Sequence, residues 1–245
     1  MAAMSSTATT DREEPRSTAG GRGTRRLTAD ARRRQLFDVA LALFAEHGYA
    51  ATTMDDIAEA AGVTKPLVYQ HFESKRALYL ELLDVFSHDL VDRIVQSTNA
   101  AAGPRQQVEL GFAGYFELMV DNENAFRLLY GRDAPDDREL GAALHRVEAT
   151  IAEAIDPLID AGLDPAHRLL LAHAVVGMAE GASRHWLASH RYHPTVHIGP
   201  GDAGGPPAGT DGSGSGAVDR AAEAARLATQ LADFAWAGLR QVHRI

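Results

Sequence analysis

The sequence predicts an all-α protein in which a small N-terminal three-helix unit is followed by a larger helical bundle. Apolar side chains recur at helical spacing in almost every segment after Thr28, and no alternating strand pattern competes with them. Pro104, Pro135 and Pro165 stand near expected helix starts, where a missing N–H costs little. No apolar run is long enough to span a bilayer, so we expect a globular protein without a membrane partner.

Residues 1–24 are expected to form a disordered arm. Their Ser, Thr, Ala, Gly, Arg and Glu side chains offer too little apolar surface to offset the chain entropy. The same residues lack the apolar core of an export signal, so the cytoplasm is the expected location. Because the chain has no cysteine, disulfides, thiol catalysis and cysteine-ligated zinc are excluded.

Four helices are expected between residues 28 and 99. Each is predicted from a Ser or Thr at its N-cap and from a stripe of apolar residues. The first two end at glycines, which suit the left-handed conformation after a helix. The expected caps are Thr28, Thr52 or Thr53, Thr64 and Ser74, with Gly48 and Gly62 at the two helix ends. Pro66 lies in the first turn of the third helix, where its missing N–H had no partner inside the helix.

The rest of the chain predicts five further helices and one linker. The helices are expected at about 105–121, 123–131, 136–161, 165–190 and 218–243. Residues 194–216 are rich in Gly and Pro and predict a flexible linker before the last helix.

The net negative charge of the chain comes from its C-terminal part. The formal net charge is -9, yet residues 1–75 carry equal numbers of basic and acidic side chains. The segment from Arg16 to Gln35 holds seven arginines and one acid, Asp30. The N-terminal unit therefore has its own local field, separate from the acidic remainder.

The stretch DIAEAAGVTKPLVYQHF has the pattern of a helix-turn-helix, in which two short helices meet at a glycine-containing turn. Its second helix would present its N-terminal residues to base edges in the major groove of double-stranded DNA. Gln70 suits adenine, and Lys65 suits guanine or a phosphate. The expected exposed set is Thr64, Lys65, Pro66, Tyr69, Gln70 and His71. The alternative is a compact three-helix core without a ligand.

The longer stretch TTMDDIAEAAGVTKPLVYQHFESKRALY resembles the DNA-binding signature of the TetR family of bacterial transcriptional regulators. The resemblance covers about 50 residues, from Arg25 to Leu80. It implies that Thr53 contacts the DNA backbone and that Lys75 holds a phosphate at the start of the fourth helix. It also implies a basic arm, with Arg25 and Arg26 in the minor groove.

The resemblance further implies the domain organisation and the mode of action. Residues 25–74 would form the DNA-binding domain, and residues 75–245 the effector-binding and dimerisation domain. We expect a homodimer, a pseudo-palindromic operator, a small and partly apolar effector, repression rather than activation, and no enzymatic activity or cofactor. The operator sequence, the effector and the regulated genes are not evident from the residues.

The resemblance directs attention to aromatic, Met and polar residues of the C-terminal part as effector contacts. The candidates are Phe112, Tyr115, Phe116, Met119, Phe126, Arg127, Tyr130, His145, His173, Met178 and Trp186. The alternative for each is an ordinary core or surface residue. The dimer interface is expected in the last two helices, at Gly177, Gly181, Leu227, Leu231, Phe234 and Leu239.

A metal site is the competing function class. His185, His190, His193 and His197 fall within 13 residues, and imidazoles at such spacing can bind Zn or Ni. No acid lies among them and the segment runs into the expected linker, so we expect no metal.

Overall fold

The computed structural model describes residues 27–131, 137–159, 162–190 and 213–242. Those residues form nine α-helices and one short 3₁₀ helix, and they contain no strand. The all-α prediction is therefore confirmed. None of the described helices combines the length and the apolar character needed to cross a bilayer. The helices are α1 (Ala29–Ala51), α2 (Met54–Ala60), α3 (Lys65–His71), α4 (Lys75–Asn99), α5 (Pro104–Asp121), α6 (Glu123–Tyr130), α7 (Arg138–Ile155), η1 (Asp156–Leu158), α8 (Pro165–Ser189) and α9 (Ser213–Val242).

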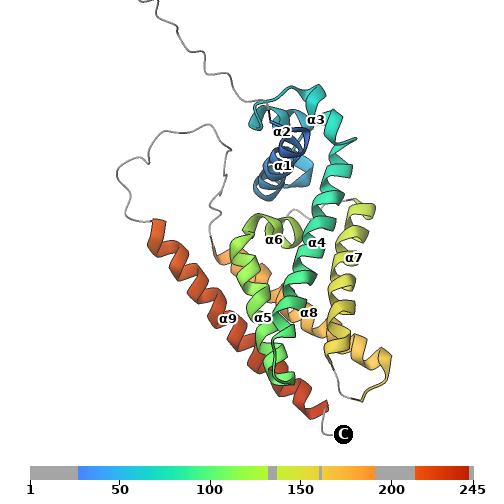
Figure 1. Cartoon of the computed structure of the whole chain (residues 1–245), viewed down its shortest axis with the longest axis vertical. Helices are drawn as coiled ribbons and strands as arrows, with labels where there is room; N and C mark the ends of the chain where they lie inside the picture. The colour runs from blue at the N-terminus through green and yellow to red at the C-terminus, as the bar shows by residue number, and fades with distance from the viewer. Residues whose placement is uncertain (1–26, 132–136, 160–161, 191–212, 243–245) are drawn as a thin grey trace, which may run out of the picture.

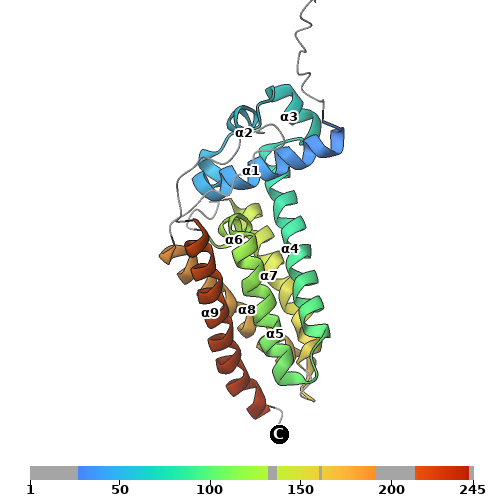
Figure 2. The same ribbon diagram turned by 60° about the vertical axis from the view of Figure 1, so that its left-hand side comes forward.

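The molecule is elongated, with the small N-terminal unit at one end (Figure 1). Helices α1, α2 and α3 sit on the first turns of α4, and α1 runs across the end of the bundle (Figure 2). The bundle contains α4, α5, α7, α8 and α9, with α9 packed mainly along α5. The short helix α6 lies between the two parts, where it packs against α1 and also contacts α4 and α8. One apolar core runs through both parts.

The expected capping hydrogen bonds form at the N-termini of α1 and α4. The Thr28 hydroxyl accepts the Ala31 N–H at 3.2 Å, and the Ser74 hydroxyl accepts the Ala77 N–H at 3.0 Å. Gly48 has φ 79° and ψ 165°, which interrupts the regular helical conformation of α1 before its last residues. This positive φ explains the glycine, although ψ lies outside the left-handed range expected there and α1 continues to Ala51.

Two expected boundaries differ from the structure. The helix expected at 136–161 ends as α7 at Ile155 and continues as η1, because Pro157 has no N–H to donate to the preceding turn. Helix α9 begins at Ser213, inside the linker expected at 194–216. The expected arm, residues 1–24, and most of the linker lie outside the described residues.

Helix α4 joins the two parts through contacts near its first turns. The Arg76 guanidinium binds the Asp137 carboxylate and lies 3.0 Å from Glu139. Asp137 in turn caps α7 by accepting the Leu140 N–H at 3.2 Å. Tyr79 donates its hydroxyl to the Leu128 carbonyl of α6 at 3.3 Å. The start of α4 is therefore fixed to both α6 and α7.

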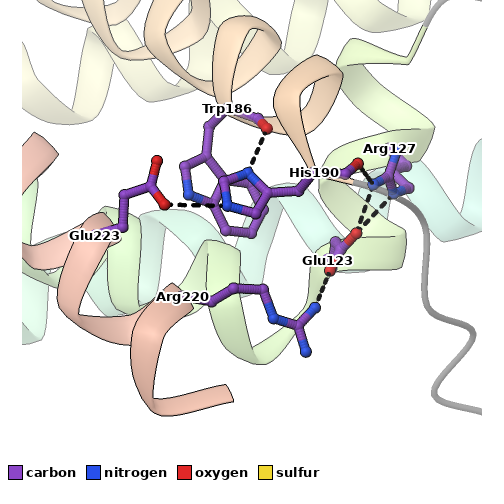
Figure 3. Close-up of polar contacts among 6 residues, drawn as sticks. All are labelled: Glu123, Arg127, Trp186, His190, Arg220 and Glu223. Carbon is purple, nitrogen blue, oxygen red and sulfur yellow. Dashed lines mark hydrogen bonds and ion pairs between the residues drawn. The ribbon is translucent and has the colours of Figure 1, made fainter. Parts of the chain in front are cut away.

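A network of charged side chains connects α6 to α8 and α9 (Figure 3). Glu123 accepts hydrogen bonds from Arg127 at 2.6 Å and from Arg220 of α9 at 3.2 Å. Beside it, the His190 ring stacks on Trp186 at 4.2 Å and lies 3.1 Å from Glu223 of α9. The Glu123 side chain is only 10% exposed, so its carboxylate depends on the two arginines for compensation.

Replacing Glu123 by Gln should destabilise the fold. The amide keeps the shape but presents an NH₂ group to an arginine, so a charged hydrogen bond is lost at a buried site. We expect the free energy of unfolding to fall by about 2 kcal/mol. The measurement is denaturant unfolding followed by circular dichroism at one fixed protein concentration.

The control is Glu117→Gln, because Glu117 is 66% exposed and lies 3.5 Å from Arg93. An exposed pair of this kind contributes at most about 1 kcal/mol. Equal loss in the two variants would contradict a structural role for the buried network.

Candidate DNA-binding face and ligand cavity

Helices α2 and α3 form the expected helix-turn-helix. Thr53 caps α2 in a capping box: its hydroxyl accepts the Asp56 N–H at 3.2 Å, and Asp56 accepts the Thr53 N–H at 2.8 Å. The turn contains Gly62 at φ 65°, a left-handed conformation in which a side chain would be strained. Val68 of α3 and Ile57 of α2 are fully buried, which holds the two helices against each other.

Most of the residues expected to read DNA lie on the outer face of α3. Thr64, Lys65, Pro66, Tyr69 and Gln70 are exposed, whereas His71 is half-buried. Tyr69 keeps 46% of its surface exposed, which is unusual for a large aromatic side chain. Pro66 stands in the first turn of α3, so the prediction that it marks a helix start is confirmed. Arg25 and Arg26 lie outside the described residues.

Two details of this face differ from the sequence interpretation. Thr64 occupies the N-cap position of α3, but its side chain makes no capping hydrogen bond. Lys65 donates to Asp55 of α2 at 2.8 Å, and this contact raises the pKa of the lysine. The ammonium is therefore held by an acid on the same face, and both side chains are more than half exposed.

Lys75 has a structural role that the sequence did not reveal. Its ammonium donates to the Tyr49 carbonyl at 2.7 Å and the Thr52 carbonyl at 2.8 Å. It also lies 4.3 Å from the centre of the Tyr49 ring, and burial lowers the pKa of Lys75. Two of its three N–H groups thus hold the end of α1 and the entry to α2 against α4.

A cavity lies within the bundle, and α6 contributes to its wall. About 820 Å³ of space not occupied by atoms lies along this lining, open solvent at its mouth included. Its walls are almost wholly apolar and come from α4 to α9 and η1. Along α5 the lining extends from Pro104 to Tyr115, roughly 16 Å at 1.5 Å per residue.

Three of the expected effector contacts line this cavity, namely Phe112, Tyr115 and Tyr130. Phe116, Met119, Phe126 and Trp186 are buried but are not among its lining residues. Arg127 pairs with Glu123, Met178 is half-buried, and His145 and His173 are exposed. The lining that the sequence did not single out comprises Ile94, Thr98, Pro104, Gln107, Val108, Gly111, Ile151, Ile155, Leu158, Ile159, Val175, Val176, Ala179 and Trp236, together with Leu239, which was expected at the dimer interface.

The missed lining residues carry no distinct sequence signal. Ile151 and Ile155, or Val175 and Ala179, are spaced four residues apart, as ordinary core positions are. These residues line the cavity only because of how α7 and α8 are placed relative to each other.

Hydroxyl groups of Tyr115 and Tyr130 belong to the lining near α6. The Tyr115 hydroxyl hydrogen bonds to Ser183 of α8 at 2.9 Å, and it also interacts with the Tyr130 hydroxyl. Burial raises the pKa of Tyr115 well above its usual range and that of Tyr130 to about 12. Both tyrosines therefore stay uncharged at neutral pH and can donate and accept hydrogen bonds.

The residues expected at the dimer interface divide into two groups. Gly177 and Gly181 are exposed on α8, and Phe234 of α9 keeps 70% of its surface exposed. Leu227 and Leu231 are half-buried and pack against the chain's own core.

The histidine cluster considered as a metal site is only partly described, because His193 and His197 lie outside the described ranges. His185 is exposed. His190 has both ring nitrogens engaged, with the Trp186 carbonyl at 2.8 Å and with Glu223 at 3.1 Å. The described part of the chain holds no group of three side chains that could share a metal ion.

Replacing Lys75 by Met should destabilise the fold, because the Tyr49 and Thr52 carbonyls lose their donor. We expect the free energy of unfolding to fall by about 1–3 kcal/mol. Lys65→Met is the matched control, since it removes an exposed pair and should change stability by at most about 1 kcal/mol. Denaturant unfolding of both variants is the measurement, and unchanged stability in Lys75→Met would contradict the structural role.

Comparisons with known proteins agree with this arrangement. Residues 36–82 match the family model described as bacterial regulatory proteins, tetR family. The chain is 32% identical over 182 residues to the transcriptional activator FasR of Mycolicibacterium smegmatis, covering 74% of this chain and 83% of that one. It is 40% identical over 94 residues to the transcriptional repressor KstR2 of Rhodococcus jostii, covering 38% of this chain and 46% of that one.

A solved structure of the same fold is the regulator FadR of Bacillus subtilis in complex with stearoyl-CoA. The two structures superpose with a TM-score of 0.60 at 16% sequence identity, over 81% of this chain and 97% of that one. With a helix-turn-helix at one end, a bundle at the other and a relative matched over most of its length, the chain belongs to the TetR family of DNA-binding transcriptional regulators.

Proposed function

We propose that the protein is a homodimeric repressor that leaves its operator when a long-chain, largely apolar ligand occupies the cavity. The observation that carries this proposal is the position of α6. This helix lines the cavity through Tyr130 and packs against α1 of the DNA-binding unit. A ligand that displaces α6 would therefore move the support on which the helix-turn-helix rests.

The DNA-binding half of the proposal rests on the outer face of α3. Gln70 would read a base edge, while Tyr69, His71 and Thr53 would contact phosphates. Lys65 would reach the DNA by exchanging Asp55 for a base or phosphate. Arg25 and Arg26 would contact the minor groove.

Several other groups complete this part of the proposal. Thr64 and Pro66 would lie against the DNA backbone, and the third N–H of Lys75 would be free to reach a phosphate. Residues 25–74 would form the DNA-binding domain, and residues 75–245 the ligand-binding and dimerisation domain. In a homodimer, two copies of α3 about 34–36 Å apart would enter successive major grooves.

The ligand class follows from the cavity wall. Apolar side chains line it over three turns of α5, so it favours a hydrocarbon chain over a charged metabolite. FadR of Bacillus subtilis, which shares the fold, was solved with stearoyl-CoA. We therefore propose an acyl chain or a similar elongated molecule, contacted by Phe112, Tyr115 and Tyr130.

The direction of regulation is part of the proposal. FasR is named an activator and KstR2 a repressor, so both directions occur among relatives of this chain. Since filling the cavity acts on α6, and α6 supports α1, we propose that the occupied state binds DNA less tightly.

The operator proposal is tested by fluorescence anisotropy with DNA selected by the protein from genomic fragments. We expect Tyr69→Ala to weaken binding to all sites, whereas Gln70→Ala should change preference at one base pair by about 1–3 kcal/mol. Salt is fixed throughout, because phosphate contacts make affinity depend on it. Selection of no sequence, or tighter binding on addition of a long-chain ligand, would contradict the proposal.

The dimer proposal places the exposed faces of α8 and α9 at the interface. Gly177 and Gly181 permit close approach, because neither carries a side chain and a Cβ at either position would have no atom within 4 Å. Leu170 and Phe234 keep 65% and 70% of their surfaces exposed, which is unusual for side chains of this size.

Phe234→Arg should weaken the dimer at least about tenfold, because it puts a charge into an apolar contact. Sedimentation velocity measures the change. Val85→Arg is the control, since Val85 is 40% exposed on α4, outside the proposed interface. Equal effects of the two substitutions would place the interface elsewhere.

A further inference from the structure

One part of the cavity wall, where α5, α6 and α8 meet, carries several hydroxyl groups. Tyr115 from α5 and Tyr130 from α6 both line it, and Ser183 from α8 supports them from behind with no exposed surface. Thr98, another polar lining residue, donates its hydroxyl to the Ile94 carbonyl of its own helix at 2.9 Å. The remaining polar side chain of the lining is that of Gln107, eight residues before Tyr115 on α5. The hydroxyls of Tyr115, Tyr130 and Ser183, which we call the hydroxyl cluster, therefore form a separate polar group in a largely apolar wall.

The hydroxyl cluster has a hydrogen-bonding capacity that it does not use internally. Three hydroxyls supply three O–H protons. The Tyr115–Ser183 hydrogen bond and the Tyr115–Tyr130 interaction take up two of them. Among the residues that the structure describes, no acceptor takes the third proton. One donor is thus left for an oxygen atom of a ligand.

The charges around the cluster decide what kind of oxygen that is. Burial is the main reason that the pKa values of Tyr115 and Tyr130 are raised, and the negative charge of Glu180 adds to both shifts. Burial disfavours any charged group at the cluster, and Glu180 disfavours a negative one. Arg184 is the nearby cation: its guanidinium lies 5.7 Å from the centre of the Tyr130 ring and acts against Glu180 on that tyrosine. Its Nε and Nη2 already bind the Glu180 carboxylate at 2.9 and 2.7 Å. A ligand carboxylate would therefore lose its hydration and gain only a cation that Glu180 already pairs, at a cost in free energy.

We propose that the hydroxyl cluster of Tyr115, Tyr130 and Ser183 receives an uncharged oxygen of the ligand, a hydroxyl or a carbonyl, and discriminates against a carboxylate. The proposal rests on the proposed function, in which a long chain fills the cavity. It narrows the ligand class to chains that end in an alcohol, ketone or ester, and it excludes free fatty acids bound with the acid group at the hydroxyl cluster.

The test compares three ligands of equal chain length, 1-dodecanol, methyl dodecanoate and dodecanoate, on the full-length protein. Trp236 lines the cavity and serves as the fluorescence reporter in a Trp186→Phe background, which removes the other tryptophan of the chain. Dissociation constants are measured at neutral pH. We expect the alcohol and the ester to bind about tenfold or more tightly than the carboxylate.

Substitutions then separate the hydroxyl cluster from the apolar wall. In Tyr130→Phe the affinity for the alcohol should fall about tenfold, while the affinity for dodecanoate changes by less than about threefold. Tyr115→Phe combined with Ser183→Ala removes both members of their buried hydrogen bond and leaves Tyr130 as the one hydroxyl of the cluster. It should act in the same direction. Tyr69→Phe, on the exposed face of α3, is the control and should change neither affinity.

The outcomes distinguish this inference from the proposed function. If all three ligands bind and the carboxylate binds as tightly as the alcohol, the inference is overturned and the proposed function stands. The inference is also overturned if Tyr130→Phe weakens all three ligands equally. If none of the three binds to the unsubstituted cluster, the long-chain ligand class itself is wrong and both proposals fall.

Discussion

The structure depends on helix α4, which belongs both to the support of the DNA-binding unit and to the wall of the cavity. The first turn of α4 carries Lys75, which holds the end of α1 and the entry to α2, and the last turns of α4 carry Ile94 and Thr98 in the cavity wall. At 1.5 Å per residue, its 25 residues extend roughly 37 Å. The inner face of this continuous helix packs into the core near both ends, through Leu78 and Ile94. Helix α4 therefore joins the DNA-binding unit to the cavity wall.

The charged network around Glu123 fixes the position of α6 more than it adds to the net stability of the fold. The attraction within a buried ion pair offsets little more than the free energy lost when its charges leave water, and an apolar cluster of the same volume would stabilise the fold equally well. Its geometry, however, fixes α6 to α9 through Arg220 and, through Arg127, to the His190 carbonyl at the end of α8. Since α6 also supports α1, the network connects the proposed dimer helices to the DNA-binding unit.

The sequence was sufficient where structure is local. Thr53, Gly62 and Pro66 act within a few residues of their own positions, so the two helices and their turn could be predicted from the residues. Their DNA-binding role was predicted from the resemblance of the longer stretch. The cavity could not, because its wall forms only when faces of distant helices meet. Phe126 satisfied the pattern of an effector contact but packs between Phe86 and Tyr115. Lys75 matched a phosphate anchor, but its carbonyl partners lie 23 and 26 residues earlier, beyond any sequence pattern.

A ligand changes a conformational equilibrium only through contacts that differ between the two states. Apolar contacts are non-directional, so a hydrocarbon chain distinguishes positions of α6 only through the space that it fills. A hydrogen bond is directional, and it is lost when its partners move by an ångström or so. Tyr130 belongs to α6, while Tyr115 and Ser183 belong to the bundle. A ligand oxygen held between them would therefore respond to the position of α6, which makes the hydroxyl cluster the part of the cavity best placed to convert occupancy into a change in DNA affinity.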